Sequence, residues 1–242
     1  MIAVSGWPKT LGLRRYEMLD STNEEARRLA RAGEQGPLWI TAAQQSAGHG
    51  RHGRRWVSEQ GNLFATLLTE AAPSRSAQLG FVAGVSVADV IAEYVHDAAV
   101  KLKWPNDVLI SGRKAAGILV EHVSDGLVAA GIGIDLGHCP EGMNAVSIAE
   151  AAGSAPDPDE VLGRLAWRMI DWMAVWQRDG FGPIRDAWIA RAGGVGDMIR
   201  AVTAERPYQG IFEDLDRDGA LLLRDENGTS HRITAADVFY GC

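Results

Sequence analysis

The sequence has few cysteines and no long apolar run, and these two features exclude several classes of protein. Cys139 and Cys242 are the only cysteines, and no Cys-x-x-Cys pair occurs. This usage excludes a disulfide framework and a structural zinc site, and it is typical of a reducing cytoplasm. No apolar run approaches the ~20 residues that cross a bilayer. Residues 1–7 also lack the cationic start and apolar core of a secretory leader. We therefore expect a cytoplasmic protein without a membrane partner.

Positive charge is also scarce. The 242 residues include 24 Lys plus Arg against 31 Asp plus Glu, for a net charge of −7. Such a balance disfavours non-specific nucleic-acid binding, so we expect no nucleic-acid partner. A hydrophobic content of 46% is ordinary for a globular protein. The length predicts one medium domain, or a larger domain with a small appendage.

One glycine-rich stretch, residues 41–64, is locally cationic. No acidic residue occurs between Glu34 and Glu59. Within it, glycines are interleaved with arginines and followed by a tryptophan: Gly48, Gly50, Arg51, Gly53, Arg54, Arg55, Trp56. Glycines let backbone N–H groups approach a ligand, and arginines supply forked donors for phosphate or carboxylate oxygens. The stretch predicts an anion site, with polyphosphate as the expected ligand. The alternative is a solvated basic loop.

The spacing Gly48-x-Gly50-x-x-Gly53 also matches the dinucleotide-binding fingerprint. That fingerprint needs a strand before it and a helix that opens within it. A strand is expected at 38–43, but the residues after Gly53 have no apolar helical period and end in turn residues. The pattern therefore argues against a nicotinamide or flavin site.

A helix start precedes this loop. Ser21 with Glu24, or Thr22 with Glu25, has the spacing of a capping box, and the helix is expected to end near Ala32. A plain helix cap explains these residues without a ligand. The functional interpretation is that hydroxyls and an amide at a helix N-terminus form a compact polar site.

The middle of the chain predicts an α+β fold, with a mainly antiparallel sheet and helices on one side of it. Strands are expected at 63–69, 101–104, 108–110, 115–123 and 127–136, and helices at 76–95, 146–152, 157–179 and 183–190. In the long helix we expect Trp167, Trp172 and Trp176 to be core residues.

Gly193, Gly194 and Gly196 mark the expected domain boundary. Short β runs follow at 199–204, 208–214, 220–224 and 230–233, with turn signals at Asp218-Gly219 and Asn227-Gly228. We predict a main domain over residues 1–195 and a small β-barrel domain over residues 196–242, which depends on the main domain for stability.

A second polar cluster stands at a strand end. Lys103 and the turn Trp-Pro-Asn106-Asp107 are followed eleven residues later by Lys114. Strand alternation places Lys101 and Lys103 on one side. A hairpin brings Lys114 back beside Asn106 and Asp107.

These residues resemble the biotin protein ligases, or biotin–[acetyl-CoA-carboxylase] ligases. That family shows a DSTN segment, a Gln-x-x-GRGRRGR-x-W loop, a KWPND segment with a following lysine, and a GxGIN strand. The corresponding residues here are Asp20–Asn23, Gln45–Trp56, Lys103–Asp107 with Lys114 and Gly117, and Gly131–Asp135. The motifs keep the family's order, and with the β tail they cover nearly the whole chain.

The resemblance implies a catalytic domain related to class II aminoacyl-tRNA synthetases and an SH3-like C-terminal domain. It implies that ATP activates biotin as biotinyl-5′-AMP, with pyrophosphate released. The biotin then passes to a lysine of a biotin carboxyl-carrier domain of acetyl-CoA carboxylase or a related carboxylase. Magnesium would be bound chiefly through the ATP oxygens. The protein would act as a monomer or a homodimer.

The resemblance also implies roles for individual residues. The catalytic residues would be Arg51, Lys114 and Asp107, with Asp107 orienting or deprotonating the incoming lysine. The biotin site would be formed by Ser21, Thr22, Asn23, Gln45, His49, Gly50, Arg51, Lys114, Gly117, Gly131 and Gly133. The ATP site would be formed by Arg54, Trp56, Lys103, Asn106 and Asp135.

Three departures from the family pattern bear on these expectations. His49 and His52 replace arginines, which lowers the charge of the loop at neutral pH. Asp135 stands where the family has asparagine, so it brings a negative charge beside the nucleotide or serves as a magnesium ligand. The residues before Asp20 leave no room for the DNA-binding domain of bifunctional members, which predicts a ligase alone. Two alternatives are a non-catalytic protein that binds biotin or its adenylate, and a lipoate or octanoate transferase on the same scaffold.

Overall fold

A seven-stranded sheet forms the centre of the protein in a computed structural model that describes residues 6–240. Along the sheet the strands are β1 (Gly12–Leu19), β2 (Leu38–Gln45), β3 (Leu63–Glu70), β7 (Leu127–Ile134), β6 (Arg113–Ser124), β5 (Asp107–Ile110) and β4 (Val100–Lys103). All neighbours are antiparallel except β1 and β2, which are joined through helix α1 (Thr22–Arg31). A helix between two strands is the usual crossover for a parallel pair. The mainly antiparallel α+β prediction is confirmed in this coarse form.

Strand β1 was not predicted from the sequence. It is an edge strand whose residues are all exposed or half-buried, and Arg14, Arg15 and Glu17 interrupt its apolar residues. An edge strand with so little burial has no alternating apolar pattern to detect. Its presence makes the N-terminal residues part of the central sheet.

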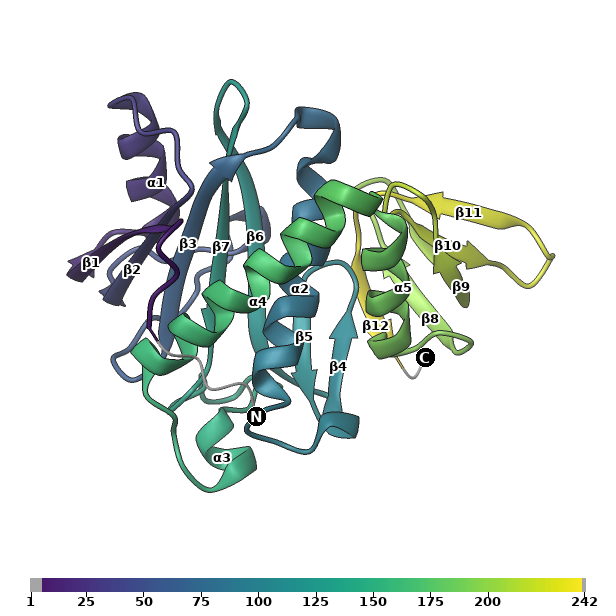
Figure 1. Ribbon diagram of the computed structural model, residues 1–242. Coiled ribbons are helices and arrows are strands. Elements are labelled where there is room, and N and C mark those ends of the chain that lie inside the picture. The colour runs from purple at the N-terminus through teal and green to yellow at the C-terminus, as the bar shows by residue number, and fades with distance from the viewer. Residues whose placement is uncertain (1–5, 241–242) are drawn as a thin grey trace.

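Helices cover both faces of this sheet, so the expectation of helices on one side was wrong. One face packs against α2 (Ser76–Ile91), α4 (Pro158–Asp179) and α5 (Gly182–Arg191), whereas α1 packs against the other (Figure 1). Successive side chains of β3 show the division, because Leu67 belongs to the large core with α2 and Leu68 to the smaller core with α1. The α1 face also carries the cavity described below.

The long helix α4 begins as predicted at Asp157. The Asp157 carboxylate accepts hydrogen bonds from the backbone N–H groups of Asp159 and Glu160. Trp176 is buried and Trp172 is partly buried, but Trp167 is 37% exposed, so its assignment to the core was wrong. A period of 3.6 residues places Trp172 and Trp176 on the inner face and turns Trp167 away from it. The short helix α3 (Ile148–Ala152) lies within the predicted segment.

A second, five-stranded antiparallel sheet follows α5 in the chain. Its order is β11 (Ser230–Ile233), β10 (Leu221–Arg224), β9 (Pro207–Leu215), β8 (Met198–Val202) and β12 (Asp237–Tyr240). It packs directly on the first unit: the indole N–H of Trp104 donates to the carbonyl oxygen of Gly219 at 3.0 Å. Residues of both units belong to one hydrophobic core. None of the helices in residues 6–240 is long and apolar enough to cross a bilayer.

Candidate functional site

A cavity of about 460 Å³ lies on the α1 face of the central sheet, between that face, the glycine–arginine loop (residues 48–56) and the second sheet. It brings together all the candidate residues named from the sequence. They are Ser21, Thr22, Asn23, Gln45, His49, Gly50, Arg51, Arg54, Trp56, Lys103, Asn106, Asp107, Lys114, Gly117, Gly131, Gly133 and Asp135. These residues come from six separate segments of the chain. Because the fold brings them to one cavity, it supports treating them as one site.

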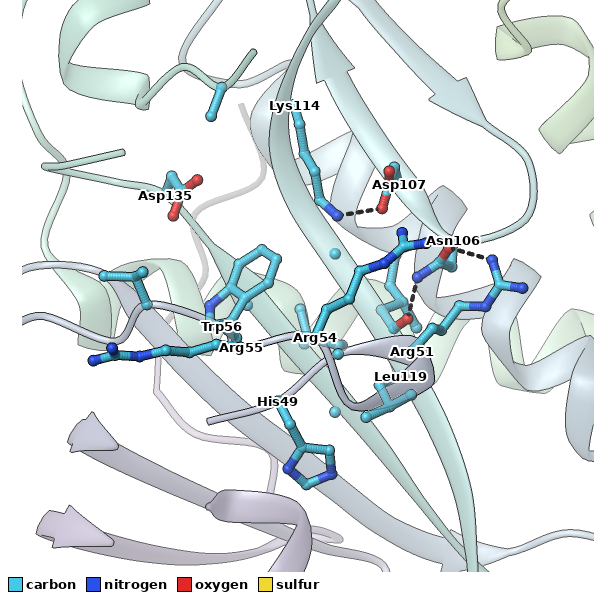
Figure 2. A pocket seen from close by; sticks show the side chains of 18 of the residues that line it. His49, Arg51, Arg54, Arg55, Trp56, Asn106, Asp107, Lys114, Leu119 and Asp135 are labelled. Atoms are coloured by element: carbon cyan, nitrogen blue, oxygen red, sulfur yellow. Dashed lines mark hydrogen bonds and ion pairs between the residues drawn. The ribbon is translucent and has the colours of Figure 1, made fainter. Parts of the chain in front are cut away.

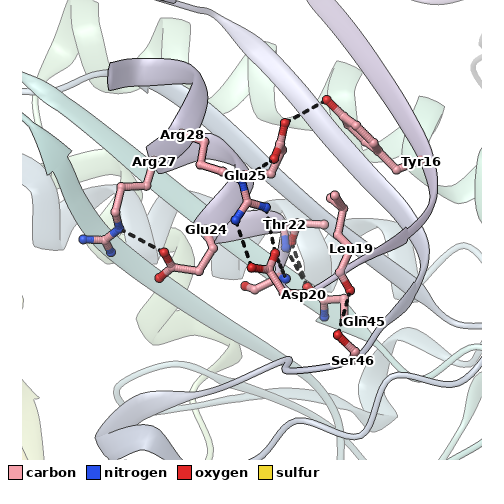
Figure 3. Close-up of polar contacts among 11 residues, drawn as sticks. Tyr16, Leu19, Asp20, Thr22, Glu24, Glu25, Arg27, Arg28, Gln45 and Ser46 are labelled. Atoms are coloured by element: carbon pink, nitrogen blue, oxygen red, sulfur yellow. Dashed lines mark hydrogen bonds and ion pairs between the residues drawn. The ribbon is translucent and has the colours of Figure 1, made fainter. Parts of the chain in front are cut away.

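One end of the cavity is formed by the N-terminus of α1, where the predicted capping boxes are absent. Ser21 is the N-cap residue, but its side chain makes no capping hydrogen bond. Instead, the Gln45 side-chain oxygen at the end of β2 accepts from the Thr22 backbone N–H at 2.8 Å and from the Thr22 hydroxyl at 3.2 Å (Figure 3). A tertiary contact thus supplies the acceptor that the first turn of the helix needs.

Asn23 is held in a fixed orientation beside Thr22. Its side-chain oxygen accepts from the hydroxyl of Thr66 at 2.7 Å, and its amide donates to Glu121 at 2.8 Å. Gly131 lies directly below, since a Cβ at this glycine would be 2.4 Å from the Asn23 oxygen. Asn23 is only 3% exposed. A buried amide with every partner in place is a preorganised site for a small polar group.

Sequence reasoning missed Thr66 and Glu121. Thr66 is fully buried in β3, and a hydroxyl within that apolar strand was the available signal. Glu121 lies on β6, where its carboxylate is also 3.6 Å from the His49 imidazole. A charged residue at the end of the apolar run 115–120 gave no sign that it faces this pocket.

The glycine–arginine loop folds back on itself as a small hairpin. The Trp56 backbone N–H donates to the Gly48 carbonyl oxygen at 2.9 Å, and the Gly50 N–H donates to the Arg54 carbonyl oxygen at 2.8 Å. Only a three-residue 3₁₀ turn, Arg51–Gly53, occurs within it. The dinucleotide fingerprint therefore lacks its helix, as the sequence indicated.

The indole of Trp56 lies over a floor of strand glycines. A Cβ at Gly133 would be 2.5 Å from the ring, and one at Gly117 would be 2.9 Å from it. The ammonium group of Lys114 is 5.2 Å from the ring centroid, within range of a cation–π interaction. The Trp56 indole N–H is buried and has no hydrogen-bond partner within residues 6–240. The glycines thus let the indole lie flat against the sheet, and the ring, which lines the cavity, suits a planar ligand.

The cations of the site have polar partners, two of which, Asp107 and Asn106, are seen in Figure 2. Lys114 and Asp107 form an ion pair with an N–O distance of 2.6 Å, as the hairpin of β5 and β6 predicted. Arg51 donates to the Asn106 side-chain oxygen at 3.3 Å. Arg54 forms an ion pair with Asp237, a residue of the second sheet.

Asp237 was missed from the sequence, together with Val238 and Phe239, which also line the cavity. These residues lie in β12, far along the chain from every motif. The Arg54 guanidinium holds the pKa of the Asp237 carboxyl below its usual range. Asp237 therefore carries a negative charge beside the arginines of the loop.

Asp135, at the carboxyl end of β7, is the buried carboxyl of the cavity. It is 3% exposed, and the amide of Asn62 donates to it at the long distance of 3.4 Å. Burial raises the pKa of Asp135 to about 7, although the charge of Lys114 acts in the opposite direction. The full negative charge expected from the sequence is therefore reduced by protonation at neutral pH. Within residues 6–240, no three His, Cys, Asp or Glu side chains are grouped to hold a metal ion.

Comparison with known proteins gives matches along most of the chain. Residues 16–136 match the model of the biotin/lipoate A/B protein ligase family, and residues 195–241 match the biotin protein ligase C terminal domain. The chain is 42% identical to the biotin–[acetyl-CoA-carboxylase] ligase of Paracoccus denitrificans, over 92% of this chain and 98% of that protein. It is 30% identical to the bifunctional ligase/repressor BirA of Bacillus subtilis, over 93% of this chain and 73% of that protein.

A solved structure supports the same relationship. The biotin protein ligase from Aquifex aeolicus, in complex with biotin and ATP, superposes with a TM-score of 0.84 at 26% sequence identity. The match covers 95% of this chain and 99% of that chain.

Proposed function

Because this chain belongs to the biotin/lipoate A/B protein ligase family, we propose that its cavity joins biotin to ATP and transfers the biotinyl group to a carrier lysine. The protein is thus an ATP-dependent biotin protein ligase. The observation that carries this proposal is the joining of two kinds of site in one cavity. A buried polar set around Asn23 and Gly131 lies at one end, and Lys114 lies beyond the strand glycines Gly117 and Gly133, with Arg51 in the same cavity.

The first step brings two anions together. A biotin carboxylate oxygen attacks the α-phosphorus of ATP, the P–O bond to the leaving group breaks, and pyrophosphate departs. Lys114 and Arg51 are charges already fixed in the cavity, so they stabilise the negative charge that develops at phosphorus without reorganising. Ser21, Thr22, Asn23 and Gln45 hold the polar head of biotin, over Gly131. The backbone of His49 and Gly50 closes above it.

The nucleotide occupies the other end, beside Trp56, Arg54, Lys103, Asn106 and Asp135. The indole of Trp56, which lies on the strand glycines Gly117 and Gly133, offers a flat surface that suits the adenine or the biotin chain. Magnesium would be held chiefly through the ATP oxygens, and Asp135 would be the residue of the protein able to ligate it. A carboxyl with no cation bonded to it is consistent with that role.

The second step is the attack of a carrier lysine on the activated carbonyl carbon, with AMP as the leaving group. Asp107 orients this lysine and accepts its proton. The ion pair between Asp107 and Lys114 keeps the Asp107 carboxylate at the point where the two steps meet. We assign the carrier to a carboxyl-carrier domain of acetyl-CoA carboxylase or a related carboxylase, and the ligase to the cytoplasm, as a monomer or homodimer.

The finer fold assignments form part of the same proposal. The division into a catalytic domain, 1–195, and a C-terminal domain, 196–242, is consistent with the order of the two sheets. The relationship of the first to class II aminoacyl-tRNA synthetases, and of the second to SH3-like barrels, also remains our proposal.

Two other functions compete with ligation of biotin. The family model includes lipoate ligases, but the match of residues 195–241 to a biotin protein ligase C-terminal domain favours biotin. A binding protein without catalysis would hold biotin or its adenylate and release no pyrophosphate.

The experiment that tests the proposal is mass spectrometry of a carboxyl-carrier domain incubated with this protein, biotin and MgATP. We expect a mass increase of one biotinyl group on one lysine, with no increase when ATP is omitted. Lipoic and octanoic acids serve as competing substrates. Modification by either acid in preference to biotin, or no modification and no pyrophosphate release, would reject the proposal.

Replacing Gly131 with alanine should weaken biotin binding selectively. The new Cβ would be 2.4 Å from the Asn23 side-chain oxygen, which Thr66 and Glu121 keep in place. Overpacking of this kind costs ~1–3 kcal/mol, which corresponds to a rise of about tenfold to a hundredfold in the KM for biotin. Pyrophosphate release measured at varied biotin concentration and at varied ATP concentration gives the KM for biotin and the KM for ATP separately.

Gly163→Ala is the matched control. Gly163 lies in helix α4, and a Cβ there would meet no atom within 4 Å. We expect wild-type kinetics for this variant. A Gly131→Ala protein with an unchanged KM for biotin would show that Asn23 is not part of the biotin site.

A further inference from the structure

Two consecutive residues at the start of β12, Ala236 and Asp237, hold Arg51 and Arg54 of the glycine–arginine loop. The Ala236 carbonyl oxygen accepts a hydrogen bond from Arg51 at 3.3 Å, and the Asp237 carboxylate forms an ion pair with Arg54. Both arginines line the cavity, and so does Asp237. The loop is therefore held by the C-terminal unit as well as by Asn106 of the central sheet.

The segment that supplies these contacts is itself firmly docked. Asp237 begins β12, which pairs with β8 through the partners Asp237 and Val202. At the other end of β12, the Tyr240 ring lies against Gly194, and its centroid is 5.4 Å from the ammonium group of Lys103. Because Val238 is buried and Tyr240 is half-buried, β12 offers a fixed support for the arginines of the loop.

The charges at this contact leave Arg54 able to bind a further anion. Hydrogen bonding to Arg54, and then the charge of Arg51, lower the pKa of Asp237, so the carboxylate is ionised. The contact uses one terminal nitrogen of Arg54, whereas a guanidinium carries five N–H donors. One carboxylate facing two arginines leaves a net positive charge at the cavity.

We propose that Asp237 is a positioning residue for the nucleotide, which holds Arg54 over the cavity so that the C-terminal sheet completes the ATP site. The inference rests on the proposed function and deepens it. Without the carboxylate, the Arg54 side chain, which is 64% exposed, has the rotamer freedom of a surface arginine. ATP binding would then have to order that side chain as well as contact it.

The test compares wild type, Asp237→Asn, Arg54→Ala and the double variant by pyrophosphate release. For Asp237→Asn we expect a rise of about tenfold in the KM for ATP, an effect typical of removing the partner that orients a ligand-binding group. The KM for biotin should stay within about twofold, because the biotin end of the cavity does not involve Asp237. In the Arg54→Ala background, the Asp237→Asn replacement should have no further effect on the KM for ATP.

The double variant shows whether Asp237→Asn acts through Arg54 or by loosening the second sheet. A general loss of stability would still change the kinetics when Arg54 is absent, whereas an effect through Arg54 would not. Glu213→Gln is the matched control, since Glu213 pairs with Arg224 in the same sheet and lies outside the cavity. We expect it to behave as wild type.

An unchanged or lower KM for ATP in Asp237→Asn would overturn the inference, as would additive effects of the two replacements. The reaction of the wild-type protein distinguishes a failure of the positioning role from a failure of the proposed function. If wild type releases no pyrophosphate with biotin and ATP, the ligase assignment itself fails. If wild type is active and the Asp237→Asn replacement leaves the KM for ATP unchanged, only the positioning role of Asp237 is rejected.

Discussion

Replacement of Lys114 by alanine should slow formation of the biotinyl-adenylate by about two to three orders of magnitude. The ammonium group of Lys114 is fixed in the cavity by the Asp107 carboxylate at 2.6 Å and by the indole of Trp56. A charge held in position where negative charge develops contributes on the order of 3 kcal/mol to the transition state. A single-turnover measurement of pyrophosphate release reports this step directly, without the later transfer to the carrier.

Lys101→Ala is the control for Lys114→Ala. Lys101 lies on strand β4 of the same sheet with an exposed side chain, and it does not line the cavity. Its loss should leave the rate unchanged, so a slow Lys101 variant would indicate a general effect of charge. A Lys114→Ala protein that forms the adenylate at a near-native rate would remove Lys114 from the mechanism.

Replacement of Asp135 by asparagine should stabilise the protein increasingly as the pH rises. Burial raises the pKa of this carboxyl from 3.8 to about 7 in the folded state. Between these values the folded protein keeps a proton that the unfolded chain has lost, so unfolding releases a proton and stability falls as pH rises. At ~1.4 kcal/mol per pKa unit, the penalty at pH 8 is at most about 4 kcal/mol. Asparagine is neutral over this whole pH range, so the variant does not lose stability in this way.

Denaturant unfolding of both proteins at pH 5 and pH 8 measures this effect. We expect the advantage of Asp135→Asn to grow by about 3 kcal/mol over that interval. Asp171→Asn, at an exposed position of α4, is the control and should show no such growth. An equal difference at both pH values would mean that the Asp135 carboxyl is ionised in the fold throughout.

The same variant decides between the two roles for Asp135 in catalysis. If Asp135 ligates magnesium, Asp135→Asn should raise the magnesium concentration needed for half-maximal adenylation. If the carboxylate only repels the triphosphate, the variant should bind ATP more tightly and react at least as fast. An unchanged magnesium midpoint would end the metal-ligand hypothesis.

Local sequence patterns determined much of the candidate site. The turn at Asn106–Asp107 between two strands predicted the contact of Lys114 with Asp107, and the alternation of Lys103 with buried neighbours set the side on which it lies. The residues after Gly53 have no apolar helical period, and they predicted that no long helix follows the glycine-rich spacing. These features depend on residues close together in the chain, where backbone period and turn chemistry act directly.

Tertiary structure alone decided which segments meet. Periodicity shows which face of an element is apolar, but it does not identify the partner of that face. It therefore could not place α1 opposite α2 and α4, replace a capping box with Gln45, or bring Asp237 from the last strand to Arg54. The protonation of Asp135 also depends on the fold, because desolvation is a property of all the surrounding atoms. The sequence specified the chemical groups of this protein, and the packing of distant segments set their charges and their orientation.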